Sequence, residues 1–325
     1  MTMAAATLIL AGCSNDENET VNNGPVELRL TSGVTVQQAR AYTATQSTSI
    51  SEGEVVSVWV DDAGTTSTAT PLYQAIQLKA TNNNGFTGDD MYFPATGNNI
   101  DIYAIHGNFR TPFSKNDAFP TDAVDYEVKA NQSNATDYTN SDLLYAYEKN
   151  VARKGNPTTK ELTFYHMLSK LELAIKIGKG APELAVSDAV KLGDVMLSGK
   201  FTPSTSATMS NQSERAGMLG TATSATPGDM TLGQVTCSDF TESDVFYNEA
   251  ILVPQDMIGK KLTFTLKNGG TLTYTIPAFE SKSDATFESG KKYLYHITIN
   301  LTGLTVTSKI VDWTPVTAVS GDAEM

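Results

Sequence analysis

Few side chains in this sequence have the types and spacing that catalysis requires. The three histidines, His106, His166 and His296, lie far apart in the chain, and none belongs to an HExxH pair. Ser289 and Lys292 match the SxxK pattern of acylating serine enzymes, but the partner motifs of that chemistry are absent. The sequence also lacks a GxxxxGKS/T phosphate loop and a GxSxG elbow. We therefore expect no catalytic residues and no enzymatic activity.

Metal and cofactor chemistry has equally little material. The pairs Asp61–Asp62 and Asp89–Asp90 offer oxygen atoms that suit Ca²⁺, but neither has the spacing of an EF-hand loop. Solvation of a loop or protection of a sheet edge explains both pairs more simply. His166 stands among apolar residues in FYHMLSKL, which is typical of a hydrogen-bonded core histidine. We expect no metal ion and no cofactor.

Aromatic residues are frequent, with 13 Tyr and 12 Phe, and they raise two alternatives. Several stand in the alternating pattern of β-strands, where aromatic side chains usually pack in a core or across strands. The other alternative is a platform on which sugar rings stack. The residues in question are Tyr92, Phe93, Tyr145, Tyr147, Tyr293 and Tyr295.

Composition narrows the class of protein further. The 325 residues include 36 acidic and 23 basic side chains, giving a net charge of −13. Nucleic-acid binding needs clustered Lys and Arg, and the nearest approach to a cluster is the pair Lys291–Lys292. At 40% hydrophobic residues the chain can bury ordinary cores, and its length suggests about two domains.

The N-terminus has the features of an export signal. The apolar run LILAGC places small residues directly before Cys13, as in a secretory signal whose cut precedes a cysteine. The alternative is a chance cysteine near the chain start, since no Lys or Arg precedes the apolar run. The following SNDENETVNNGP is polar and acidic, which predicts a flexible tether. Cys237, in VTCSDF, is expected to be a small buried hydrophobe rather than a disulfide partner.

From Val26 onward the sequence has a period of two rather than 3.6. Val26, Leu28 and Leu30 alternate with polar residues, and Val34 and Val36 continue the pattern after Ser32-Gly33. Turn signals such as Asn268-Gly269-Gly270 separate many short segments of this kind, which predicts an all-β fold of sandwiches. The predicted strands are 26–36, 54–60, 72–79, 99–106, 143–147, 160–164, 171–177, 191–197, 245–253, 261–266, 272–276, 293–301 and 304–311.

Charged and Gly/Pro-containing residues at 149–159 suggest a boundary between two domains. We expect a signal peptide and tether at 1–24, an N-terminal β-sandwich at 25–155 and a C-terminal β-sandwich at 156–325. The Ser/Thr/Gly-rich stretch 202–233 predicts a long loop in the second domain, partly ordered by short strands.

Several segments together resemble the fimbrillin family of Bacteroidetes, the FimA-like and Mfa-like pilus subunits. They follow the family's order along nearly the whole chain: LAGC at Cys13, LRLTSGVTVQQARAY, DLLYA, FYHMLSKLEL, ILVPQ and FESGKKYLYHITINLTGLTVTSKIVDW.

The resemblance implies two tandem transthyretin-like β-sandwich domains and export to the outer membrane as a lipoprotein acylated at Cys13. It also implies cleavage between Arg40 and Ala41 by an Arg-directed protease, which removes the first strand with Val26, Leu28, Leu30, Val34 and Val36. A strand from a neighbouring pilin subunit then fills the groove. This is β-augmentation, in which backbone hydrogen bonds give affinity and alternating apolar side chains fill pockets.

The resemblance leaves the position in the pilus open. The chain after Trp313 ends in TPVTAVSGDAEM, whose apolar alternation is weak. Either residues 304–319 act as the donated strand, or this subunit accepts a strand and donates none, as a tip subunit would. The leading hypothesis is thus a structural and adhesive subunit of a cell-surface pilus, with a host or bacterial surface glycan or protein as a further partner. The alternatives are a non-polymerising surface lipoprotein that binds glycans, and a secreted hydrolase with two carboxylates across a pocket.

The predicted acylation of Cys13 gives the first testable prediction. A single acyl chain holds a protein at a membrane only marginally, so stable anchoring requires the several chains that a lipoprotein carries. Full-length Cys13→Ala should therefore move from the outer-membrane fraction to the soluble fraction, whereas Cys237→Ala should fractionate as wild type. If Cys13→Ala stays with the outer membrane, the predicted lipidation is wrong.

Overall fold

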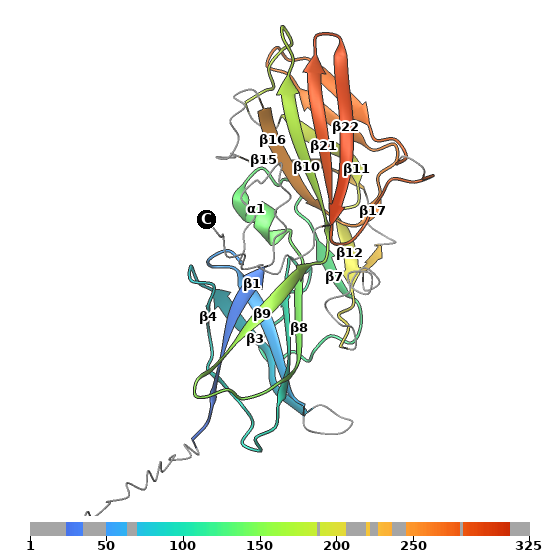
Figure 1. Cartoon of the computed structure of the whole chain (residues 1–325). Coiled ribbons are helices and arrows are strands. Elements are labelled where there is room, and N and C mark those ends of the chain that lie inside the picture. Colours follow the sequence, from blue (N-terminus) through green and yellow to red (C-terminus); the bar gives the residue numbers. More distant parts are fainter. Residues whose placement is uncertain are drawn as a thin grey trace, which may run out of the picture.

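A computed structural model describes residues 24–34, 50–63, 70–186, 189–205, 219–221, 227–235, 245–279 and 282–312. Strands dominate these residues, which confirms the all-β prediction (Figure 1). Figure 1 shows the N-terminal strands in the lower half of the molecule and the C-terminal strands in the upper half. Five residues with a predicted role lie outside the described residues: Cys13, Val36, Arg40, Ala41 and Cys237.

Eight strands form the N-terminal sheet, in the order β4-β3-β2-β6-β8-β9-β1-β5. Their bounds are β1 Glu27–Val34, β2 Val55–Asp62, β3 Thr70–Ala80, β4 Phe86–Thr87, β5 Met91–Tyr92, β6 Ile100–His106, β8 Leu144–Val151 and β9 Thr158–His166.

The N-terminal sheet folds over between β8 and β9, which pair only at Leu144↔His166 and Tyr145↔Tyr165. Beyond these two pairs the strands separate, so that β9, β1 and β5 form a second layer over the other five strands. The buried side chains of both layers belong to one hydrophobic core, with Leu28 from β1, Leu162 from β9 and Val58 from β2. Alternation explains this core, because every second residue of each strand points into it.

The outer face of the five-stranded layer is covered as well. Trp59 of β2 makes edge-to-face contacts with Phe113 and Phe119, with ring centroids 5.0 and 5.5 Å apart. Its indole N–H donates a 2.8 Å hydrogen bond to the carbonyl of Asp117. The segment between β6 and β7 is therefore held against the sheet by aromatic packing.

The C-terminal part is a sandwich of a five-stranded sheet, β15-β16-β10-β21-β22, and a four-stranded sheet, β14-β11-β18-β19. The Asn268-Gly269-Gly270 turn joins β18 to β19 as predicted, with Gly269 at φ +86°. The bounds are β10 Ser169–Ile177, β11 Val190–Val195, β14 Gly228–Thr231, β15 Gly233–Val235, β16 Val245–Leu252, β18 Lys261–Thr265, β19 Thr271–Thr275, β21 Lys291–Asn300 and β22 Gly303–Asp312, with a two-stranded ladder of β17 Gln255–Asp256 and β20 Thr286–Phe287.

A third, small sheet joins the two halves. β7 (Val124–Glu127), from the N-terminal half, pairs with β12 (Ser198–Phe201) of the C-terminal half, which pairs in turn with β13 (Leu219–Thr221). One hydrophobic core runs through this junction and contains residues of both halves. The two sandwiches are thus packed together through an apolar interface rather than joined by an open linker.

The observed pairings move the boundary that the sequence suggested after residue 155. β9 follows that point, yet it pairs with β1 and β8 of the N-terminal sheet. The pairings change to the C-terminal sheet between β9 and β10, across the fully buried Met167 and Leu168. The Gly- and Pro-containing residues at 152–157 form the β8–β9 connection inside the first sandwich instead of an interdomain linker.

The sequence did not indicate helix α1 (Ala135–Asn140), the one helix among the residues that the structure describes. Its residues include two threonines and a terminal Asn, which have low helix propensity. The local sequence feature that favours this helix is its N-cap residue, Asn134, whose side chain accepts a 2.9 Å hydrogen bond from the Asp137 N–H. In Figure 1, α1 lies where the two halves meet.

Gln132, just before α1, fastens this segment to the C-terminal sheet. Its side chain donates a hydrogen bond to the Ile251 carbonyl and accepts one from the Ile251 N–H, both 2.8 Å long. Gln132 is 1% exposed, so these bonds are shielded from water. A carboxamide here satisfies the backbone of β16 as a neighbouring strand would.

Replacing Gln132 tests this attachment. Gln132→Ala leaves a buried N–H and a buried carbonyl of Ile251 without partners, each costing about 1–3 kcal/mol. We expect the free energy of unfolding, measured with urea, to fall by about 2–4 kcal/mol. The exposed Gln234→Ala on β15 is the matched control and should change little. Equal stabilities for both variants would contradict the role of Gln132.

Candidate functional site

Strand β1 is the middle strand of the second layer of the N-terminal sandwich. On one side it pairs in parallel with β9, from Leu28↔Thr158 to Val34↔Phe164. On the other side it pairs with β5 at Glu27↔Tyr92 and Leu28↔Met91. The layer therefore depends on β1, because neither β9 nor β5 has another partner over these residues within the described chain.

The inward side chains of β1 contribute directly to the core. Leu28 and Leu30 of β1 and Val26, which directly precedes the strand, are 3%, 5% and 9% exposed, and they pack in the same cluster as the opposite layer. This confirms that these three residues form an apolar face. Val34 is the last residue of β1.

The next inward position on β1 is small and polar. Ser32 is buried, and its N–H donates a 2.7 Å hydrogen bond to the Asn84 carbonyl. Its neighbour Thr31 forms a bridge with Gly85 in the β3–β4 turn. These contacts join β1 to the far edge of the first layer. The inward-facing side chains from residue 26 to residue 32 are thus three aliphatic ones followed by a small polar one.

The start of β1 is also held in place. The Phe93 N–H donates to the Val26 carbonyl over 2.9 Å. The Asn156 side chain accepts from the Glu27 N–H over 3.2 Å and donates to the Pro25 carbonyl over 3.3 Å. Residues 35–49 connect β1 to the rest of the chain, and they contain Arg40 and Ala41.

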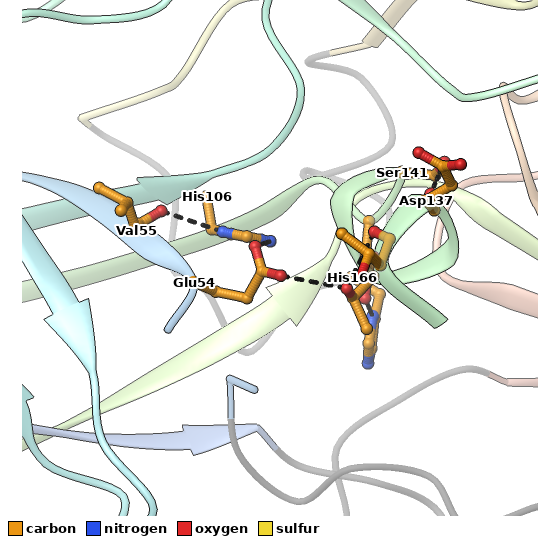
Figure 2. Close-up of polar contacts among 9 residues, drawn as sticks. Glu54, Val55, His106, Asp137, Ser141 and His166 are labelled. Carbon is orange, nitrogen blue, oxygen red and sulfur yellow. Dashed lines mark hydrogen bonds and ion pairs between the residues drawn. The ribbon is translucent and has the colours of Figure 1, made fainter. Parts of the chain in front are cut away.

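The sequence candidates for catalysis have structural partners. His166 Nδ1 lies 2.7 Å from Asp142 Oδ2, which agrees with a core histidine held by a polar partner. His106 Nδ1 lies 3.1 Å from the Val55 carbonyl, and its Nε2 is 4.0 Å from Glu54. Figure 2 shows the His106 ring next to the Glu54 carboxylate, with His166 on the side toward α1.

The SxxK pair is likewise divided between two structural roles. The Ser289 hydroxyl donates a 2.6 Å hydrogen bond to the Met167 carbonyl. Lys292 Nζ lies 3.1 Å from Glu172 Oε1 and is 1% exposed. Burial lowers the pKa of His296, the third histidine, which lies on β21. These contacts place no nucleophile beside a general base.

The acidic pairs do not build a cation site. Asp61 and Asp62 are successive residues of β2, so their side chains point to opposite faces of the sheet. Asp89 forms a 2.5 Å ion pair with Lys115. Among the described residues, no group of three or more His, Cys, Asp or Glu side chains is arranged to hold a metal ion. In the same parts of the chain, no helix has the length and apolar character needed to cross a membrane.

The aromatic alternation mostly serves packing, as one of its two explanations predicted. Phe93, Tyr145, Tyr147, Tyr293 and Tyr295 are all buried. Tyr92 differs, because its side chain on β5 is exposed.

A buried group of four charges on the C-terminal sheet had no sequence signal. Lys170 Nζ lies 3.0 Å from Glu172 and 2.6 Å from Glu249, and Lys292 lies 3.1 Å from Glu172. Tyr138 of α1 covers this group, with Lys170 Nζ 5.8 Å from its ring centroid. The charges balance in pairs, which a buried network requires.

The pKa of Glu172 shows how the network is balanced. Burial acts to raise this pKa, but Lys170 and Lys292 outweigh it and hold the pKa below its ordinary value. Burial lowers the pKa of Lys292 despite the attraction of Glu172. The network therefore supports α1 through paired, buried charged side chains.

The described residues thus form a protein of two β-sandwiches, in which the buried polar groups described above hold the structure together. A family model described as fimbrillin-like matches residues 39–313. The chain belongs to this fimbrillin-like family, which confirms the resemblance seen in the sequence.

Individual relatives agree with this assignment. A Bacteroides uniformis protein named as a fimbrium subunit, Fim1C, is 28% identical over 318 residues, covering 95% of this chain and 93% of the relative. Two solved structures share the fold: a cell adhesion protein of Bacteroides ovatus (TM-score 0.60, 18% identity, 90% of this chain and 99% of that one) and one of Bacteroides uniformis (TM-score 0.57, 23% identity, 89% and 99%). The tip fimbrial protein Mfa3 of Porphyromonas gingivalis, truncated at its C-terminus, gives a TM-score of 0.50 with 11% identity, covering 89% and 100%.

The charge network predicts a stability change that depends on pH. A carboxylate with a lowered pKa contributes stability above its unfolded-state value of 4.5 and loses it as pH falls through the folded-state pKa. Glu172→Gln should therefore reduce the free energy of unfolding by about 3–5 kcal/mol at pH 7 and flatten its decline between about pH 5 and 3.

Glu183→Gln is the matched control for this measurement. Glu183 forms an exposed ion pair with Lys267, and such pairs contribute little. Urea unfolding at pH 7 and at pH 3.5 should show no measurable effect for the control. Equal acid sensitivity of Glu172→Gln and wild type would contradict the role assigned to Glu172.

Proposed function

We propose that the protein is a structural and adhesive subunit of a cell-surface pilus, assembled by replacement of β1 with a strand from a neighbouring subunit. Family membership supports the pilus assignment. The observation that carries the mechanism is the position of β1, central in its layer yet connected to the remaining chain only through residues 35–49. Acylation at Cys13 tethers the precursor to the outer membrane before cleavage at Arg40–Ala41.

Loss of β1 would leave a strong acceptor. Burying Val26, Leu28 and Leu30 contributes about 1.5–3 kcal/mol for each side chain, and an empty groove forfeits this. The backbone edges of β9 and β5 would lose their pairing partner at the same time. Unpaired edges beside an apolar groove favour addition of another strand.

The sequence of β22 repeats the pattern of β1. The segment LRLTSGV at 28–34 aligns with LTVTSKI at 304–310, with identical residues at Leu28/Leu304, Thr31/Thr307 and Ser32/Ser308. Aliphatic residues also correspond at Leu30/Val306 and Val34/Ile310. The repeat includes the small fourth position that the Ser32 site requires, so β22 of a second copy matches the groove in a single register.

The environment of β22 makes it suitable for exchange. It is an end strand of the five-stranded sheet as described, paired with β21 from Gly303 to Asp312. Leu304 and Val306 are only partly buried there, and Ile310 is 43% exposed. In the groove of a neighbour, Leu304 and Val306 would occupy the fully buried positions of Leu28 and Leu30. A shaft subunit would both donate and accept in this way, whereas a tip subunit would only accept.

Cleavage and peptide binding test the proposal for either position. Protein cut at Arg40 by a trypsin-like protease should bind a synthetic peptide of residues 303–312, whereas uncut protein and Arg40→Ala exposed to the same protease should not. The reason is that intact chain connectivity keeps β1 in the groove at high effective concentration. Fluorescence anisotropy of a labelled peptide measures the difference.

Two altered peptides serve as controls. Val306→Asp places a charge in an apolar pocket, and Ser308→Phe overfills the small Ser32 site, so each should bind at least about tenfold more weakly. Equal binding of the native peptide by cut and uncut protein would contradict strand replacement. Equal binding of all three peptides would contradict the proposed register.

A further inference from the structure

A polar cleft in the N-terminal sandwich lies apart from the β1 groove. It has a volume of about 420 Å³ and is formed by β3, the residues before β5 and the turn at 115–116. Its polar lining comprises Tyr73, Gln74, Asp89, Asp90, Lys115 and Asn116. Leu72 supplies an aliphatic wall, with Ile76 in the hydrophobic core behind it. This size falls within the usual range for small-ligand sites.

A strained bulge shapes one side of the cleft. The β2–β3 register runs from Val58↔Ile76 to Val60↔Tyr73, so Gln74 and Ala75 are opposite a single residue, Trp59. Ala75 has φ +45°, a left-handed conformation that is unfavourable for an L-residue. Ala75 is fully buried and lacks the polar side chain that eases this conformation in Asn or Asp.

The opposite side of the cleft carries a second left-handed residue that is bonded to the bulge. Asn116 has φ +76°, and its N–H donates a 2.9 Å hydrogen bond to the Gln74 carbonyl. Backbone strain of this kind collects at ligand sites, where surrounding structure holds it in place. The bulge directs Gln74 to the cleft instead of continuing the regular ladder of β3.

Fixed contacts hold the remaining walls. The Asp117 carboxylate accepts a 2.7 Å hydrogen bond from the Ser114 N–H, and the Asp117 carbonyl accepts from Trp59. The Tyr73 hydroxyl accepts a 2.8 Å hydrogen bond from the Tyr92 N–H. The cleft is therefore organised before any ligand enters, which reduces the entropic cost of binding.

The chemistry of the lining identifies a class of ligand. Asp90 offers acceptors, while the carboxamides of Gln74 and Asn116 both donate and accept. Adjacent hydroxyl groups on a sugar ring require this mixture, and its C–H face suits the Tyr73 ring and the aliphatic wall. Lys115 pairs with Asp89, and Arg29 of β1 is near enough to Asp90 for electrostatic attraction. Both carboxylates of the cleft lining therefore have a neighbouring cation, which disfavours a divalent cation.

We propose that this cleft binds a pyranose sugar unit of a surface glycan. None of its lining residues lies on β1, although Arg29 of β1 is near Asp90. The proposal goes beyond assembly of the pilus and assigns a recognition site to the side of the subunit.

Saturation-transfer NMR on the full, uncut chain tests the proposal with the methyl glycosides of glucose, galactose, mannose and N-acetylglucosamine as probes. At least one should give a saturable signal at millimolar concentration or below. Asp90→Asn and Asn116→Gly should each weaken it at least tenfold. Glycine tolerates the positive φ of Asn116, so that variant removes the carboxamide without adding strain.

Asp122→Asn is the matched control, because it removes an exposed carboxylate outside the cleft. It should bind the sugar as wild type does, and thermal unfolding should show that all three variants are folded. The absence of a saturable signal for every glycoside would overturn the proposal. So would unchanged affinity in both cleft variants, or cleft resonances that respond to Ca²⁺ and to no sugar. Strand-exchange results do not affect these outcomes, since the protein remains uncut.

Discussion

The parallel pairing of β1 with β9 is the constraint on which the N-terminal sandwich depends. β9 separates from β8 after two residue pairs, so its backbone groups from Thr158 to Phe164 are satisfied by β1. Buried backbone groups without partners are costly, and the same strand also supplies three aliphatic side chains to the core. The layer is therefore stable only when some strand with the correct pattern occupies this position.

The rest of the molecule forms a rigid support for that position. β9 continues into β10 through Met167 and Leu168, so the edge that receives β1 is directly connected to the central strand of the C-terminal sheet. Gln132 and the charge network beneath α1 bind the two halves on one side, and the β7–β12 pairing binds them on another.

Much of the fold was predictable because alternating sequences dominate it. The period-two pattern correctly indicated β1, β9 and β10, and the apolar surroundings of His166 correctly indicated a buried histidine. Other features depend on tertiary register, which local sequence does not contain. β5 is a strand only because Met91 and Tyr92 pair with β1. Likewise, Glu172 lies opposite Glu249 only when β10 and β16 are paired in their observed register. The bulge at Ala75 is similarly imposed by Asn116 and Trp59 from distant segments.

Hydrogen–deuterium exchange on cleaved protein measures the central dependence most directly. If β1 alone satisfies β9, release of the peptide that ends at Arg40 should greatly accelerate exchange of the Leu162 and Phe164 amides, while β10 remains protected. Adding the peptide of residues 303–312 should restore protection over the same residues. Amides of β9 that stay protected after the β1 peptide has left would contradict the account.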